Sequence, residues 1–298
     1  MSAAAIIRPA FVPGVYTRHE LANADYHAID ALSASGTKRI MQSPLHYRYD
    51  REHPTEPTES MLMGTALHCA VLEPDRFEDE VIAVPDDAPR RPAARSANAK
   101  KPSLETLDAL DFWRDFDRRA AGKTVLKAEA FEKVRHMAAS VQRLPAVQTY
   151  LCDGEAEYSM LWNDARLGIP CKCRFDYLRP DGIALDLKSC QDASPEGFAR
   201  AVAQFKYHWQ AAFYNNGHEH VRDASLRVFL FIAVESVAPY CAASYVLEPN
   251  AIAFGANRVE EAMLLYRQAT ETGYWRGYSE KIQPVRLPRW ATTLVESY

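Results

Sequence analysis

The sequence lacks the features that mark several large protein classes. No apolar run approaches the roughly 18 residues of a membrane span, and the N-terminus has no basic segment followed by a long apolar stretch. The six cysteines are Cys69, Cys152, Cys171, Cys173, Cys190 and Cys241. They form neither a regular disulfide framework nor the tight cluster that would hold iron and sulfur. We therefore expect a cytoplasmic protein.

Common catalytic motifs are missing as well. There is no Gly-x-Ser-x-Gly elbow and no dinucleotide-binding glycine fingerprint. The tripeptide at 122–124, Gly-Lys-Thr, is not a phosphate-binding P-loop, because the upstream glycine and the preceding strand are absent. The net charge of -4 excludes a protein that is basic all over, but it leaves room for a basic channel on one face. With 298 residues, 48% of them hydrophobic, the chain can bury a large core, and we interpret it as a single domain.

The stretch 171–188 is typical of a β-hairpin closed by a three-residue loop. Pro180 presets its φ for a type I turn, and Gly182 can take the left-handed position that follows. In this register Asp176 lies directly opposite Asp186. Because strand side chains alternate, Lys188 shares the face of Asp186. A two-residue loop would instead place the two carboxylates on opposite faces, so the prediction depends on the turn.

Two carboxylates and an ammonium on one face of a sheet are costly in a core and useful around a metal ion. Asp176 and Asp186 supply the oxygen ligands that magnesium prefers. Lys188 cannot bind a metal while it is protonated, but it can stabilise charge on a phosphate or help to activate water. This combination favours metal-assisted phosphodiester hydrolysis over acyl transfer. A two-carboxylate glycosidase stays open, although it gives Lys188 no role.

Two N-terminal helices carry further candidates. Ser33 or Ser35 can cap a helix that ends before 43–44, and Lys38 and Arg39 lie close enough to hold a phosphate with its first turn. The alternative is a capped surface helix with solvated charges. A nearly all-apolar helix should end before residue 74, and His68 is its one strongly polar interior residue. Taken alone, His68 is more typical of a hydrogen-bonded core histidine than of a metal ligand.

The remaining pattern predicts an α/β fold. Helices are expected at 103–121, 127–143, 195–216 and 250–272, with one ending at Gly217 and one near Gly273. Strands are expected at 155–162, through the hairpin, and at 226–234 and 240–247. This order implies a central mixed sheet flanked by helices, with an N-terminal helical extension. Residues 1–25 are interpreted as an N-terminal arm, and 85–103 as a mobile basic loop that is either a linker or a DNA-contacting flap.

The hairpin with Asp176, Asp186 and Lys188 resembles the signature of the PD-(D/E)XK nuclease superfamily, which has a restriction-endonuclease-like core. The pentapeptide Gln-Ala-Ala-Phe-Tyr from Gln210 to Tyr214 resembles the Gln-x-x-x-Tyr motif of its RecB-like branch. The segments 64–74, 121–126 and 207–214 are similar to the exodeoxyribonuclease VIII (RecE-like) family. The likeness extends over about residues 25–250, with its motifs in the family's order.

This resemblance implies a magnesium-dependent exonuclease that digests one strand of linear duplex DNA from the 5′ end, leaving 3′ single-stranded tails for recombination and repair. It makes His68, Asp176 and Asp186 metal ligands and Lys188 the catalytic lysine, with manganese as a substitute metal. Gln210 and Tyr214 would position the DNA strand. A 5′-phosphate pocket would use the candidates Ser33, Ser35, Lys38 and Arg39.

The resemblance also implies partners: a ring-like homo-oligomer threaded by DNA, and a single-strand annealing protein of the RecT type. Two other functions stay open. One is a structure-specific or single-strand nuclease with the same site. The other is a non-catalytic DNA-binding recombination protein on a decayed nuclease fold, against which the complete set of His68, Asp176, Asp186 and Lys188 argues.

Overall fold

The computed structural model describes residues 9–287, and its centre is a six-stranded mixed sheet. In spatial order the strands are β1 (Gly14–Tyr16), β4 (Glu155–Asn163), β5 (Pro170–Leu178), β6 (Ile183–Cys190), β7 (Val228–Glu235) and β8 (Ala242–Val246). All neighbours are antiparallel except β6 and β7, which run parallel. A parallel pair needs a long crossover, and two helices between β6 and β7 provide it. The predicted mixed α/β class is confirmed.

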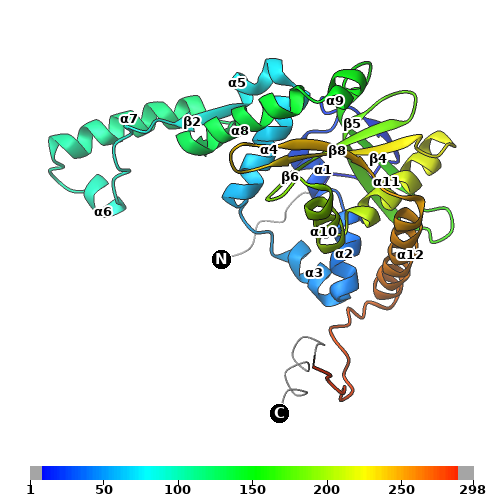
Figure 1. Cartoon of the computed structure of the whole chain (residues 1–298). Helices are drawn as coiled ribbons and strands as arrows, with labels where there is room; N and C mark the ends of the chain where they lie inside the picture. The colour runs from blue at the N-terminus through cyan, green and yellow to red at the C-terminus, as the bar shows by residue number, and fades with distance from the viewer. Residues whose placement is uncertain (1–8, 288–298) are drawn as a thin grey trace, which may run out of the picture.

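Helices cover both faces of this sheet (Figure 1). One face packs against α2 (Ala34–Gln42), α3 (Pro44–Glu52), α10 (Pro195–Phe205), α11 (Tyr207–Arg222) and α12 (Pro249–Thr272). The other packs against α4 (Glu59–Leu72), α8 (Ala128–Gln142) and α9 (Pro145–Tyr150). Alternation along the strands divides the core accordingly: Phe231 of β7 contacts Phe198 on the first side, and its neighbour Ile232 belongs to the second cluster with Val134. Among the described residues, no helix is both long and apolar enough to cross a bilayer.

The expected helix start at Ser33 is confirmed, since its hydroxyl accepts a hydrogen bond from the Gly36 backbone N–H at 3.2 Å. The end of α12 at Gly273, with φ of 69°, is confirmed as well. The predicted helix end at Gly217 is wrong, because α11 continues to Arg222. A Cβ at Gly217 would lie 2.7 Å from Trp162, so this glycine lets α11 approach the sheet closely.

Three short strands were not predicted: β1, and a pair that lies outside the central sheet. β3 (Thr124–Lys127) lies between the two helices that were expected at 103–121 and 127–143, and it pairs in parallel with β2 (Val81–Val84). Four residues are too few for a period to stand out in the sequence. The intervening helices are α6 (Ala94–Ala97) and α7 (Leu104–Ala120). The stretch expected to be a loop at 85–103 therefore contains a short helix.

The N-terminal segment is tied to the sheet by two buried cations of β5. Residues 1–8 of the expected arm lie outside the described residues; further along, β1 pairs with β4 and α1 (Asn23–Ala28) follows. Lys172 Nζ donates to the carbonyl oxygens of Tyr26 at 2.6 Å and Ile29 at 2.8 Å. Arg174 donates to the Leu21 carbonyl at 2.7 Å. These contacts cap the end of α1 and hold the segment beside the hairpin.

Candidate active site

The hairpin closes as its turn chemistry predicts. Gly182 has φ of 80°, and its N–H donates to the Arg179 carbonyl at 3.1 Å, while the Arg179 N–H donates to Ile183 at 2.9 Å. Tyr177 pairs with Leu185, and extrapolating this register by one residue places Asp176 opposite Asp186. The predicted three-residue loop and its register are confirmed.

The two strands then separate where the carboxylates lie. Within the described residues, backbone pairing of β5 with β6 extends only from Leu178 to Tyr177, and beyond it the Leu187 N–H donates to Asp176 Oδ2 at 2.7 Å. The Asp176 carboxylate thus replaces a backbone carbonyl as the acceptor. Because Leu187 faces the second core cluster, Asp186 and Lys188 face the other side, as expected.

Asp186 is almost completely buried, with 1% of its surface exposed, and it is held by two partners. Gln210 Nε2 of α11 donates to Oδ1 at 2.5 Å, and Lys188 Nζ lies 2.5 Å from Oδ2. The Lys188 contact does not have hydrogen-bond geometry, so Oδ2 is a buried oxygen without a hydrogen-bond partner. A further ligand at this oxygen would share it with the Lys188 ammonium.

Lys188 remains a cation in this site. Burial lowers its pKa, but the negative charges of Asp186 and Asp176 outweigh burial and leave the pKa above its ordinary value. Its ammonium also lies 5.1 Å from the ring centroid of Tyr207, the first residue of α11. A lysine held in this way can act through its positive charge.

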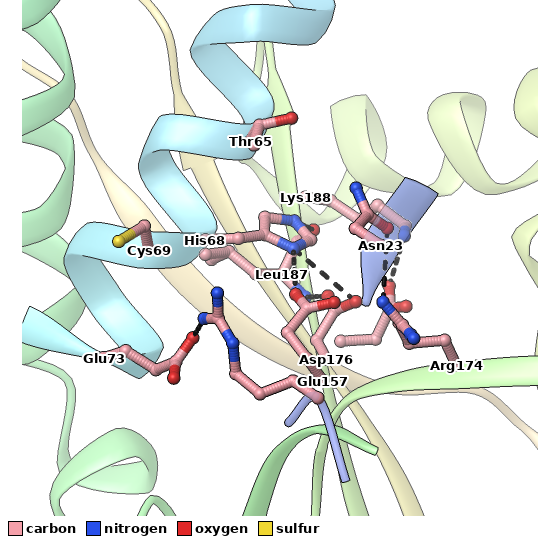
Figure 2. A network of polar contacts seen from close by, with 12 residues as sticks. Asn23, Thr65, His68, Cys69, Glu73, Glu157, Arg174, Asp176, Leu187 and Lys188 are labelled. Atoms are coloured by element: carbon pink, nitrogen blue, oxygen red, sulfur yellow. Dashed lines mark hydrogen bonds and ion pairs between the residues drawn. The ribbon is translucent and has the colours of Figure 1, made fainter. Parts of the chain in front are cut away.

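His68 of α4 completes the site from the other direction (Figure 2). Its Nε2 lies 3.2 Å from the Leu187 carbonyl oxygen, and its Nδ1 lies 3.6 Å from Asp176 Oδ1 and 3.7 Å from Glu157 Oε1. Burial lowers the pKa of His68, but Asp176 and Glu157 raise it above its ordinary value overall. Burial raises the pKa of Asp176, although the charge of His68 opposes this. The imidazole therefore supplies the positive charge that the two carboxylates require.

Glu157 belongs to this site although the predicted set of metal ligands does not include it. It lies in β4 between the pairs Ala156–Tyr177 and Tyr158–Phe175, and its φ is 52°, a left-handed value that is uncommon outside glycine. Strand alternation breaks at the same level, since Phe175 and Tyr177 pack in different core clusters. Backbone irregularity of this kind concentrates at functional sites. A positive φ at a glutamate has no signal in the sequence.

These side chains have the donor chemistry that a divalent ion needs. Among residues 9–287, no group of three or more His, Cys, Asp and Glu side chains is already gathered as a metal-binding cluster. The separations of 3.6 and 3.7 Å between His68 and the two carboxylates nevertheless compare with the roughly 3–4 Å between ligands that share an ion at about 2.1 Å. Together with Asp186 Oδ2, which accepts no hydrogen bond and contacts only the Lys188 ammonium, the donor chemistry fits a metal ion after small side-chain movements.

A cavity of about 1190 Å³ connects these residues to the phosphate-binding candidates. It is lined by the following predicted residues: Ser33, Ser35, Lys38, Arg39, His68, Asp176, Gln210 and Tyr214. Tyr214 packs edge-on against Phe175, with ring centroids 4.9 Å apart, which fixes the wall of the cavity on α11. Asp186 and Lys188 are not part of this lining, but Gln210, which is, donates to Asp186. The structure thus brings the predicted set to one place.

The phosphate-binding candidates differ in what they contact. Lys38 has its ammonium 5.7 Å from the Tyr207 ring centroid, on the same ring as Lys188. Burial and the neighbouring Lys188 charge lower its pKa to about 8. Arg39 instead pairs with Asp50 through hydrogen bonds of 2.6 and 2.8 Å. Ser33 caps α2, and its hydroxyl lies 3.0 Å from that of Ser35. Of the two basic candidates, Lys38 is the one without an acidic partner among residues 9–287.

Comparisons with known proteins identify the family and the fold. A family profile described as "PDDEXK-like domain of unknown function (DUF3799)" matches residues 33–288. A solved structure from Eubacterium rectale, described as a candidate exonuclease, is 14% identical with a TM-score of 0.57, over 90% of this chain and 94% of that one. The structure of SSO0001 is 13% identical over 74% of this chain and 93% of that one, but its TM-score of 0.29 is too low to indicate a shared fold. No curated protein matches the chain.

Proposed function

The chain belongs to the family of PDDEXK-like domains, and from this premise we propose that it is a metal-dependent nuclease of the PD-(D/E)XK superfamily. One observation carries the proposal. Asp176 and His68 line a single cavity, although α4 and the hairpin are more than a hundred residues apart. Asp186 is joined to the same cavity by its hydrogen bond from Gln210, and Lys188 contacts Asp186. A superfamily fold without this set would support only DNA binding.

In the proposed site, Asp176, Asp186 and His68 hold magnesium, with Glu157 as a further oxygen donor, and manganese substitutes because an imidazole suits it. A bound divalent ion supplies a Lewis acid and lowers the pKa of an attacking water. The protein's own contribution is positioning and charge. Gln210 fixes the Asp186 carboxylate, and the Lys188 ammonium stabilises the negative charge that develops on the scissile phosphate.

At the finer level, we propose a 5′-to-3′ exonuclease that acts on linear duplex DNA and leaves 3′ single-stranded tails. The motif order in the sequence supports this proposal. So does the position of Lys38, a basic side chain that lines the same cavity as His68 and Asp176. A 5′-phosphate bound there would set the direction of digestion. Ring formation and a single-strand annealing partner remain parts of the same proposal.

The test is resection of a linear duplex labelled at either end, with magnesium and with a chelator. We expect release from the 5′ end, none with the chelator, and a loss of about 100-fold or more in Asp186→Asn and Lys188→Ala. Lys133→Ala is the control, because Lys133 lies on α8 and pairs with Glu129. Full activity in either active-site variant would refute the assignment. Cleavage of circular DNA or flaps in preference to ends would support the nuclease proposal but refute the exonuclease proposal.

A further inference from the structure

Residues 85–123 form an arm that projects from the body of the protein. Figure 1 shows α6 and α7 extending away from the sheet beyond β2. α7 has 17 residues, which corresponds to a length of roughly 25 Å. Most of its surface is exposed, and only Ala109 and Phe116 are buried in this helix. An element that contributes so little to the core invites a search for a binding role.

The basic half of the arm is fixed on α7. Arg91 makes two hydrogen bonds to Asp117, at 2.9 and 2.7 Å, and its guanidinium lies 4.1 Å from the ring centroid of Trp113. Trp113 Nε1 in turn donates to the Pro89 carbonyl at 2.9 Å. A bidentate pair stacked on an aromatic ring gives one orientation. The segment is therefore presented in a defined position along the helix.

This segment carries four exposed cations without a partner. They are Arg90, Arg95, Lys100 and Lys101, and none of them makes an ion pair or hydrogen bond within residues 9–287. The arginines of α7 behave differently: Arg114 pairs with Asp111, and Arg118 and Arg119 pair with Asp115. Acids are thus available on the arm, but they neutralise α7 and not the segment beside it. The unneutralised cations are suited to an external polyanion.

The C-terminal end of the arm lies at the catalytic cavity. Gly122 and Thr124, where the arm returns to β3, line the same cavity as His68 and Asp176. A duplex that enters the cavity beside these residues would have the arm within reach. At 3.4 Å per base pair, a length of about 25 Å spans about 7 base pairs.

We propose that the arm binds the phosphate backbone of duplex DNA outside the active site, through Arg90, Arg95, Lys100 and Lys101. This inference rests on the proposed function, whose substrate it positions. A second copy of the chain is the competing occupant, and it would use the exposed Leu104 and Leu107 of α7. The four unpaired charges favour DNA, because nothing neutralises them in the described protein and a duplex neutralises all four.

The test measures affinity for a 30-base-pair duplex by fluorescence anisotropy, without divalent metal, over a range of salt concentrations. The variant replaces all four cations by alanine. The control replaces four paired arginines, Arg114, Arg118, Arg119 and Arg135, and so changes net charge equally. Each lost phosphate contact lowers the slope of log affinity against log salt by about 0.9, so we expect a decrease of about 3–4 and at least tenfold weaker binding. In the control, we expect a change below about 1.

An unchanged slope in the arm variant, or an equal change in the control, would overturn the proposal. Sedimentation of the same proteins identifies the competing occupant: a smaller assembly in Leu104→Ala/Leu107→Ala, together with an unchanged salt slope in the arm variant, would assign the arm to a second copy. The catalytic assignment is tested separately by Asp186→Asn and Lys188→Ala. Because anisotropy needs no cleavage, failure of the nuclease proposal and failure of the arm proposal give different results.

Discussion

Gln210 Nε2 donates a hydrogen bond to Asp186 Oδ1 at 2.5 Å, which joins the middle of the sheet to the helix that covers it. Both groups are buried, and the second carboxylate oxygen of Asp186 faces the Lys188 ammonium. A buried carboxylate without this donor would be free to turn. The contact explains why an amide belongs at this position of α11.

Replacing Gln210 by alanine should therefore impair catalysis without unfolding the protein. A hydrogen bond to a charged group contributes about 1.5–3 kcal/mol, so we expect kcat to fall roughly 10- to 100-fold. The measurement is kcat for duplex digestion at saturating metal and DNA, with thermal unfolding as a check on folding. Gln204→Ala on α10 is the control, since Gln204 lies on a different cavity. A Gln210→Ala enzyme with normal kcat would show that Asp186 does not need this support.

Binding of a 5′-phosphate in the proposed pocket should depend on pH through Lys38. Its pKa is lowered to about 8 by burial and by Lys188, with Asp186 opposing and Lys206 adding to the effect. An anion binds the protonated amine, so the affinity for a 5′-phosphorylated end should decrease as the pH rises through 8. Lys38→Arg stays charged over this range and should lose the decrease. Competition between 5′-phosphorylated and 5′-hydroxyl ends from pH 6.5 to 9.5 measures this relative affinity. Parallel curves for the wild type and Lys38→Arg would contradict the assignment of Lys38 to the phosphate pocket.

Adding a single methyl group at Gly217 should strongly destabilise the folded protein. In Gly217→Ala the new Cβ would meet Trp162 at 2.7 and 2.8 Å, so α11 must move away from the sheet. We expect a loss of about 1–3 kcal/mol in the free energy of unfolding, measured in urea. Gly64 in α4 has nothing within 4 Å of its own added Cβ, and Gly64→Ala should stabilise by about 0.4–1 kcal/mol. Equal effects at the two glycines would disprove the packing argument.

Lys172 should be required for stability and not for chemistry. It is 4% exposed, and its replacement by methionine leaves the carbonyls of Tyr26 and Ile29 without their donor. Each unsatisfied buried group costs about 1–3 kcal/mol, so we expect a loss of roughly 2–5 kcal/mol on urea unfolding. Lys123→Met is matched to it, because Lys123 donates to the Glu78 carbonyl at an exposed position and should cost below about 0.5 kcal/mol. Similar losses in both variants would mean that burial is not what makes Lys172 important.

The sequence by itself determined the parts that depend on neighbours along the chain. The loop at 180–182 needs only a proline and a glycine at fixed positions, and these two residues set the register that places Asp176 opposite Asp186. Helix ends were equally legible where a cap or a left-handed glycine follows, as at Ser33 and Gly273. The same local logic failed at Gly217, because a glycine that admits a close tertiary contact looks identical to one that ends a helix.

Only the tertiary structure decided which distant residues share the site. On its own helix, His68 was more typical of a core residue than of a ligand, and α4 had to pack against β5 and β6 before its imidazole lay 3.6 Å from Asp176. Glu157 reaches the site because the backbone of β4 is irregular at this residue. Arg39 is paired with Asp50 of the next helix. The physical reason is common to these cases. Strand and turn geometry act over a few residues, whereas burial, pairing of charges and close packing depend on segments that meet only when the chain folds.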